Sequence, residues 1–234
     1  MSLENLRLAL DVSVFWEYRR LLLAGLAVNF YVFALAAVLA IALGFPACLL
    51  RLHRWRPLQW LGTGYAEFFR NTPEYVFLIW VHFVLPLLIS ALIATKVNFP
   101  PLLSAVLALG FSYSGYFTET FRAGILAVPR GHLEAGRALG MPRRLILWRI
   151  TLPQAARQML PEAMNQLVSL FKATSIISLI TVPDIMYQVV QITSTEMKPL
   201  PLYSSAAFVY FLVIFAMSTF VRWVTEGWRT RGWA

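Results

Sequence analysis

Charged residues are scarce in this sequence. Asp, Glu, Lys and Arg make up 13% of the 234 residues, while hydrophobic residues make up 59% and the mean hydropathy is +0.66. A soluble domain carries about 25% charged residues, so the composition indicates a membrane protein. The net charge of +9 does not indicate a nucleic-acid partner, because the basic residues gather in segments between apolar runs.

Cysteine is nearly absent. Cys48 is the single cysteine, which excludes a disulfide within the chain and a cysteine metal cluster. The three histidines, His53, His82 and His132, lie far apart and lack metal-ligand spacing. We therefore expect no metal site and no resident cofactor.

Motifs for ATP binding and for hydrolysis are also missing. The pattern GxxxxGK[ST] requires Gly directly before Lys, yet the three lysines follow Thr95, Phe171 and Met197. HExxH, GxSxG and paired intramembrane aspartates do not occur either. The sequence therefore predicts a protein that is not an enzyme.

Long uncharged runs are what the sequence does contain. They cover residues 21–50, 75–95, 97–118 and 199–221, and a fifth apolar stretch, 163–183, carries one charge, Lys172. About 20 helical residues cross the ~30 Å hydrocarbon layer. We predict an all-α membrane protein with about five transmembrane helices, and a single transmembrane domain over 1–234 because no long linker appears.

The basic residues predict the topology. Thirteen Lys and Arg residues fall in 51–57, 117–163 and the segment after 221, against five on the other side. Since cytoplasmic loops collect these residues, we expect the N-terminus outside and the C-terminus inside. The first 20 residues carry both signs of charge and no separate apolar region, so we expect no cleaved signal peptide. "LENLRLALDV" is amphipathic and is predicted to lie in the membrane interface.

The segment 129–153 contains a helix with clear end signals. Gly131 precedes it, Gly140 follows it and Pro142 prevents its continuation. Glu134 and Arg137 suit the positive and negative ends of the helix dipole. A helix of about two turns is marginal in water, so we expect it to pack against something. A basic interfacial loop without any partner is the alternative.

This segment resembles the "EAA" loop of ABC-importer membrane subunits. The likeness rests on Glu134-Ala135, then Gly140, then Ile150-x-Leu152-Pro153. In that family the loop is the coupling helix, which docks into a cytoplasmic ATPase. Gly136 replaces the usual Ala, which should slightly loosen the helix. The resemblance implies that the following residues couple to the ATPase: Gly131, Glu134, Ala135, Arg137, Gly140 and Met141.

Three further segments resemble the polar amino acid permeases of the histidine and glutamate type. "FFRNTPEYVFLIW" is similar to their FRGTP segment, with Asn71 for Gly. "YFTETFRAGILAVPRG" is similar to the stretch before the EAA loop, and His132 then replaces Gln. "FKATSIISLITVPDI" is similar to their Lys-Asp-Thr-Ser-Leu stretch, with Ala173 for the acidic residue.

The resemblance implies a type I ABC importer permease in the bacterial inner membrane, importing polar amino acids of acidic or broad range. Its expected partners are two copies of a cytoplasmic ATP-binding subunit, a second permease (identical or homologous), a periplasmic or lipid-anchored substrate-binding protein, and the lipid bilayer. The alternatives are an ATP-independent facilitator or channel, and an ABC permease for opines or other small polar solutes.

Charges near the second apolar run form a possible stripe. Glu67, Arg70 and Glu74 are spaced i, i+3 and i+7, so a continuous helix would place them on one face. Thr72-Pro73-Glu74 is also a helix start, with Thr72 as N-cap and Pro at N1, so the helix is expected to break there. Arg70 and Glu74 are candidates for either an interfacial ion pair or the translocation gate.

Other charges fall at the end and in the middle of apolar runs. Glu119 and Arg122 are expected to form a structural pair where the third run ends. Lys172 lies near the midpoint of the run 163–183, where an unpaired ammonium costs at least ~2.5 kcal/mol. It therefore needs a carboxylate from another span, from a partner permease or from the substrate. Thr174 and Ser175 are candidates for the substrate pathway, although interhelical packing explains them equally well.

Overall fold

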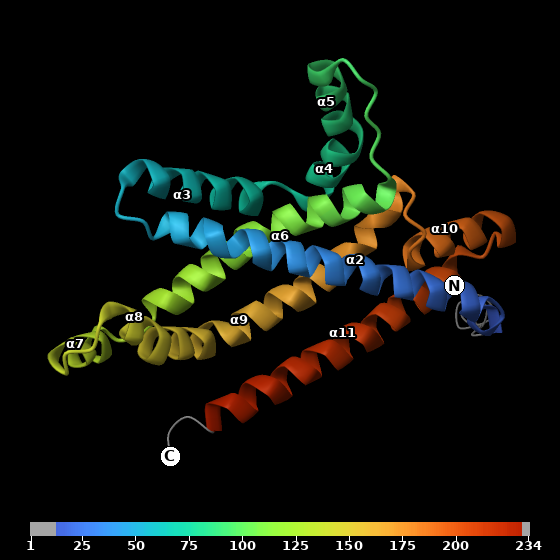
Figure 1. The fold of residues 1–234 in the computed structure, drawn as a ribbon. Coiled ribbons are helices and arrows are strands. Elements are labelled where there is room, and N and C mark those ends of the chain that lie inside the picture. The colour runs from blue at the N-terminus through green and yellow to red at the C-terminus, as the bar shows by residue number, and fades with distance from the viewer. Residues whose placement is uncertain (1–12, 231–234) are drawn as a thin grey trace. The chain divides into compact units, whose positions relative to one another are not determined.

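The computed structural model describes residues 13–230, and side chains from 16 to 226 (Figure 1). Within this range all regular secondary structure is helical. The elements are α2 (Ser13–Arg51), α3 (Arg56–Asn71), α4 (Glu74–Ile79), η1 (Trp80–Val84), α5 (Leu85–Ile93), α6 (Pro101–Leu126), α7 (Arg130–Ala138), α8 (Arg143–Ile146), η2 (Leu147–Thr151), α9 (Leu152–Ala173), η3 (Thr174–Ile180), α10 (Ile185–Glu196) and α11 (Pro199–Thr230).

The predicted all-α membrane fold is confirmed. Four helical stretches are long and apolar enough to cross a membrane: Trp16–Arg51, Glu74–Ile93, Arg143–Ile180 and Pro199–Glu226. The remaining predicted run, 97–118, falls largely within the 26-residue helix α6. The number of spans and the orientation of the termini stay predictions. The predicted interfacial segment "LENLRLALDV" lies outside the described residues.

The break expected near Thr72 is also confirmed, but the predicted cap is wrong. Helix α3 ends at Asn71 and α4 begins at Glu74, with Pro73 in the N-cap position. The Thr72 hydroxyl donates to the Phe68 carbonyl at 2.6 Å, and the Thr72 amide bonds the same carbonyl. Thr72 therefore closes the first helix and does not cap the second.

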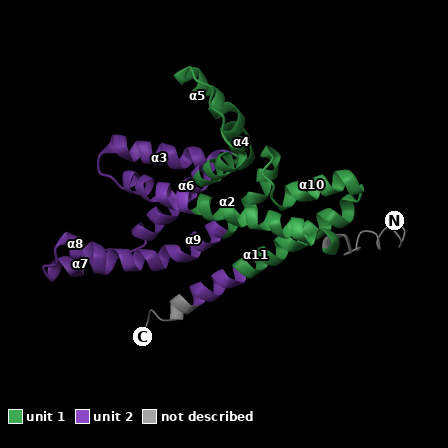
Figure 2. Ribbon diagram, turned by 45° about the vertical axis from the view of Figure 1, so that its right-hand side comes forward, with its two compact units in different colours: residues 1–37, 73–110, 168–217 green, residues 38–72, 111–167, 218–234 purple. Residues whose placement is uncertain are grey.

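Two compact units divide the chain (Figure 2). Unit 1 comprises 1–37, 73–110 and 168–217, and unit 2 comprises 38–72, 111–167 and 218–234. We describe each unit by itself. The prediction of one transmembrane domain over 1–234 stays a prediction.

Unit 1 has an apolar core formed by α2, α10 and α11. Its buried members are Leu22, Ile185, Val189, Ile192, Leu202 and Ala206. Beside this core lies a buried polar cluster. The Asn29 amide donates to Asp184 Oδ2 at 3.2 Å and to Thr174 Oγ1 at 3.1 Å, and Asn29 Oδ1 accepts from the Ile185 amide at 3.3 Å. Asn29 thus ties α2 to both ends of the segment 174–185.

The carboxylate of Asp184 should make stability depend on pH. Asp184 caps α10 by accepting from the Tyr187 amide at 2.8 Å, and burial raises its pKa from 3.8 to about 6. Between these values the native state holds the proton more tightly than the unfolded chain. The contribution of Asp184 to the free energy of unfolding therefore falls as pH rises from about 4 to about 6.

We expect Asp184→Asn to remove that contribution while retaining a capping side chain. The measurement is the melting temperature of the purified protein in detergent at several pH values between 4 and 7, for both proteins. An unchanged pH dependence in the variant would contradict the assignment.

Unit 2 contains a close helix crossing between α6 and α9. A Cβ atom on Gly124 of α6 would lie 2.7 Å from the Met159 Cβ and 3.1 Å from the Ala155 carbonyl oxygen. Real Cβ atoms do not approach other carbons so closely. Glycine is therefore required at this position for α6 to reach α9.

We expect Gly124→Leu to lower the melting temperature by roughly 5 °C, because overpacking costs about 1–3 kcal/mol. Gly64 of α3 is the matched control, since a Cβ there meets nothing within 4 Å. Gly64→Leu should leave the melting temperature unchanged or raise it slightly. Equal losses in the two variants would argue against the tight crossing.

Candidate functional site

The segment between α6 and α9 holds a short helix whose ends are sharply defined. Helix α7 has nine residues and follows Pro129. At its other end Gly140 adopts φ +72°, the Gly140 amide donates to the Arg137 carbonyl at 2.9 Å, and the Met141 amide donates to the Gly136 carbonyl at 3.0 Å. This is the Schellman arrangement that glycine permits. The expected short helix and its end at Gly140 are confirmed, but the expected start is wrong: α7 begins at Arg130, so Gly131 lies in its first turn.

The contact face of α7 is centred on Gly136. Helix α7 contacts α8 and η2, and Gly136 is buried. A Cβ at this position would lie 3.0 Å from Ile150 Cδ1 and 3.2 Å from Ile146 Cγ1. A second contact joins α7 to the start of α9, where His132 Nδ1 and Gln154 Oε1 are 2.8 Å apart.

The sequence expectation that Gly136 loosens α7 left out this contact. Because glycine has no side-chain methyl, α7 lies directly on the two isoleucines. The van der Waals packing gained in this way offsets the lower helix propensity of glycine. Part of the packing that a two-turn helix needs is therefore supplied by the chain itself.

Most of α7 and of its C-terminal turn is exposed in the described structure. Gly131, Glu134, Ala135, Arg137 and Gly140 are exposed, and Met141 is half-buried. Leu139, which the sequence reasoning missed, is 80% exposed. We call Glu134, Arg137, Leu139 and Gly140 the α7 docking face. The available sequence signal was an apolar residue, leucine, directly before the glycine that ends the helix.

A network of charges joins three helices within unit 2. Arg51, the last residue of α2, lies 3.4 Å from Glu67 of α3 and also hydrogen-bonds Glu119 of α6. Arg70 lies 3.8 Å from Glu67, and Arg122 pairs with Glu119. The structure thus forms the expected Glu119–Arg122 pair and places Arg70 beside Glu67 of the predicted stripe. Arg51 was missed because its partners are 16 and 68 residues away.

Glu74 does not continue this stripe along one helix. It is the first residue of α4, after the break at residues 72–73. Its carboxylate lies in the first turn of α4, where the helix dipole favours a negative charge.

Lys172 lies where a long helix changes its winding. It is in the last turn of α9, and the chain then tightens into the 3₁₀ segment η3, which ends at Thr181 with φ +63°. Its side chain is exposed, and within the described side chains no carboxylate lies within ion-pair distance of it. A partner for this ammonium is therefore not provided by the described part of the chain.

The two other pathway candidates differ from each other. Thr174 is fully buried; its hydroxyl donates to the Phe171 carbonyl at 2.7 Å and accepts from Asn29. Ser175 is half-buried and donates to the Lys172 carbonyl at 2.9 Å. Lys172 and Ser175 are therefore more accessible than Thr174.

The described side chains contain no group of three or more metal-ligating residues. His82 hydrogen-bonds the Ser104 hydroxyl at 2.9 Å, which satisfies one ring nitrogen. The described chain thus combines helices of membrane-spanning length with a short, largely exposed helix, α7.

Known proteins resemble this chain along most of its length. Residues 37–230 match the model of a family described as binding-protein-dependent transport system inner membrane component. The chain is 32% identical over 225 residues to the L-cystine transport system permease protein TcyB of Bacillus subtilis, covering 93% of each chain. It is 33% identical over 215 residues to the arginine ABC transporter permease protein ArtQ of Escherichia coli, covering 85% of this chain and 89% of the relative.

Solved structures agree. A crystal structure of an amino acid ABC transporter with histidines superimposes with a TM-score of 0.83 at 27% identity, covering 92% of this chain and 98% of the other. The MetNI methionine ABC transporter in an inward-facing form gives a TM-score of 0.66 at 20% identity, with 89% and 98% covered. At that identity the second match bears on the fold alone.

Proposed function

Because the chain belongs to the family of binding-protein-dependent transport system inner membrane components, we propose that it is the membrane-spanning permease subunit of an ATP-driven ABC importer for amino acids. As a member of this family it is a multi-pass protein of the bacterial inner membrane. Its partners in general are ATP-binding subunits and a substrate-binding protein.

The observation that carries this proposal is the construction of α7. The helix packs on Ile146 and Ile150 through Gly136, while Arg137 and Leu139 are exposed. An exposed leucine flanked by charges suits a protein partner with an apolar pocket and a polar rim. We assign the α7 docking face, together with Gly131, Ala135 and Met141, to contact with the ATP-binding subunit.

Coupling then follows from differential binding. Closure of two ATP-binding subunits on ATP would push the α7 helices of two paired permeases, and only an affinity difference between inward-open and outward-open states can shift that equilibrium. In this scheme the second permease is a copy or homologue related by a two-fold axis. A substrate-binding protein delivers the amino acid to the outer end.

Lys172 is our candidate for the substrate pathway, with Ser175 beside it. The named substrates of the relatives, cystine and arginine, differ in side chain and share the α-carboxylate. An exposed ammonium without a carboxylate partner in the described chain suits that shared group. Arg70 and Glu74 stay our candidates for the translocation gate, because charged residues beside an apolar run are candidates for function. Thr174 would support this region through its bond to Asn29.

The test is recovery of the ATP-binding subunit with the tagged full-length chain from the source membrane. We expect co-purification with the wild type and its loss with Leu139→Asp. Met197→Asp is the matched control, because Met197 is 81% exposed and also directly follows a helix. An ATP-independent facilitator would transport solute without any such subunit, and that outcome would refute the proposal.

A further inference from the structure

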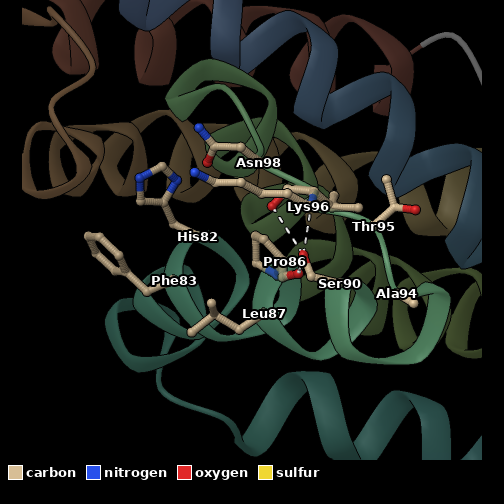
Figure 3. Close-up of a pocket in the computed structure, with 10 residues that line it drawn as sticks. His82, Phe83, Pro86, Leu87, Ser90, Ala94, Thr95, Lys96 and Asn98 are labelled. Carbon is tan, nitrogen blue, oxygen red and sulfur yellow. Dashed lines mark hydrogen bonds between the residues drawn. The ribbon is translucent and has the colours of Figure 1, made fainter.

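A cavity of about 560 Å³ lies within unit 1, beside α5 (Figure 3). One part of its lining is apolar and comes from Phe83, Pro86 and Leu87. The other part is polar and comes from His82, Lys96 and Asn98. Figure 3 shows the Lys96 side chain extending toward the imidazole of His82 and the carboxamide of Asn98. The cavity is therefore amphipathic, with a cation on its polar part.

The cavity is built from a turn that is held at defined points. Ala94 adopts φ +53° and ends α5, so the chain reverses after the helix. The Val97 amide then donates to Ser90 Oγ at 2.8 Å, and that hydroxyl donates to the Pro86 carbonyl at 2.6 Å. Ser90 thus fastens the returning segment to α5.

The other wall is equally fixed. His82 lies in the π-helical turn η1, a type of irregularity that is frequent at functional sites. Its Nδ1 is 2.9 Å from Ser104 Oγ, which orients the ring and leaves its second nitrogen for another partner.

The position of the cavity relative to the membrane follows from α5. The apolar span Glu74–Ile93 ends at Ile93, and Leu87 and Leu92 near that end are 70% and 84% exposed. Exposed leucines on a span of this kind are suited to contact with hydrocarbon. Lys96 comes three residues after the span, which is the level of the lipid headgroups.

We propose that this cavity binds a phospholipid with an anionic headgroup. The phosphate lies against the Lys96 ammonium and the Asn98 amide, and an acyl chain lies along Phe83 and Leu87. No acidic side chain of the described range forms an ion pair with Lys96, so the cation is available to a ligand. The negative charge of such a headgroup complements a lysine at the level of the headgroups. The proposal concerns the bilayer and is independent of which solute is transported.

The experiment is native mass spectrometry of the full chain, purified with its accompanying subunits, delipidated and titrated with phosphatidylglycerol. We expect Lys96→Gln to weaken phosphatidylglycerol binding about fivefold and Lys96→Arg to restore it. Phosphatidylethanolamine, which has the phosphate without the net charge, should bind more weakly than phosphatidylglycerol.

Lys198→Gln is the matched control. Lys198 is also exposed and also follows a residue with positive φ just after a helix. Equal binding by the wild type and Lys96→Gln, or equal losses at Lys96 and Lys198, overturns the proposal. Glycerol phosphate distinguishes the sources of the phosphate: displacement of the lipid by this soluble anion would indicate a site for free anions and would likewise overturn it. None of these measurements needs ATP or transport, so their failure is separate from failure of the proposed import function.

Discussion

Gly140→Val is expected to reduce ATP-driven amino acid uptake by about tenfold or more. Gly140 sits at φ +72°, where a residue with a side chain is strained by about 1–2 kcal/mol and a β-branched residue by more. The valine would also open the two hydrogen bonds that end α7 at Arg137 and Gly136. The α7 docking face would then lose its shape where Leu139 is presented. The measurement is uptake of labelled amino acid by proteoliposomes containing the whole importer.

The control for this prediction is made at the same position. Asparagine tolerates left-handed backbone, so Gly140→Asn should retain most of the uptake. Recovery of the ATP-binding subunit should fall with valine and not with asparagine. Full coupled uptake by the valine variant would remove α7 from the mechanism.

Lys172→Met should reduce amino acid uptake by more than about tenfold, while the amount of assembled importer stays unchanged. The ammonium is exposed, and the described chain offers it no carboxylate. Removing the ammonium therefore leaves no carboxylate of the described residues without its ion-pair partner, and methionine fills a similar volume. A charge-assisted contact with the substrate contributes about 1.5–3 kcal/mol, which corresponds to a loss of tenfold or more.

Two variants separate a substrate contact from a general effect of charge. Lys172→Arg should keep part of the activity, because the cation remains. Lys198→Met removes a lysine in the segment before α11 and should leave uptake unchanged. Uptake at the wild-type level by Lys172→Met would show that the ammonium is not needed for the passage of substrate.

The fold follows from the sequence where the physical signal is local. Uncharged runs of about 20 residues predict long helices, and Gly140 and Pro142 predict the C-terminal end of α7. These features depend on neighbours within a few residues, so a single sequence contains them.

The rest of the site depends on distant residues. From the sequence alone, Arg51 is an ordinary charge between two apolar runs. Its partners Glu67 and Glu119 become neighbours only when α3 and α6 pack beside it. Asp184 reads as a simple helix cap, but its burial comes from α2, and Asn29 lies 155 positions away in the sequence. Gly136 reads as a weak point because propensity is local, whereas Ile146 and Ile150 come from the following turns. The role of Lys172 stays a prediction, since the described side chains offer it no ion-pair partner.

The seat of α7 has a mechanical consequence. Gly136 rests on Ile146 and Ile150 through van der Waals contact alone, and such contacts resist compression steeply while their attraction is shallow. A force that pushes α7 toward the two isoleucines is therefore resisted at once by repulsion between the atoms. A force that pulls α7 away is opposed mainly by the hydrogen bond between His132 and Gln154 and by the covalent chain. If α7 couples as proposed, pushing and pulling on it should therefore differ in their sensitivity to weakening of the His132–Gln154 hydrogen bond.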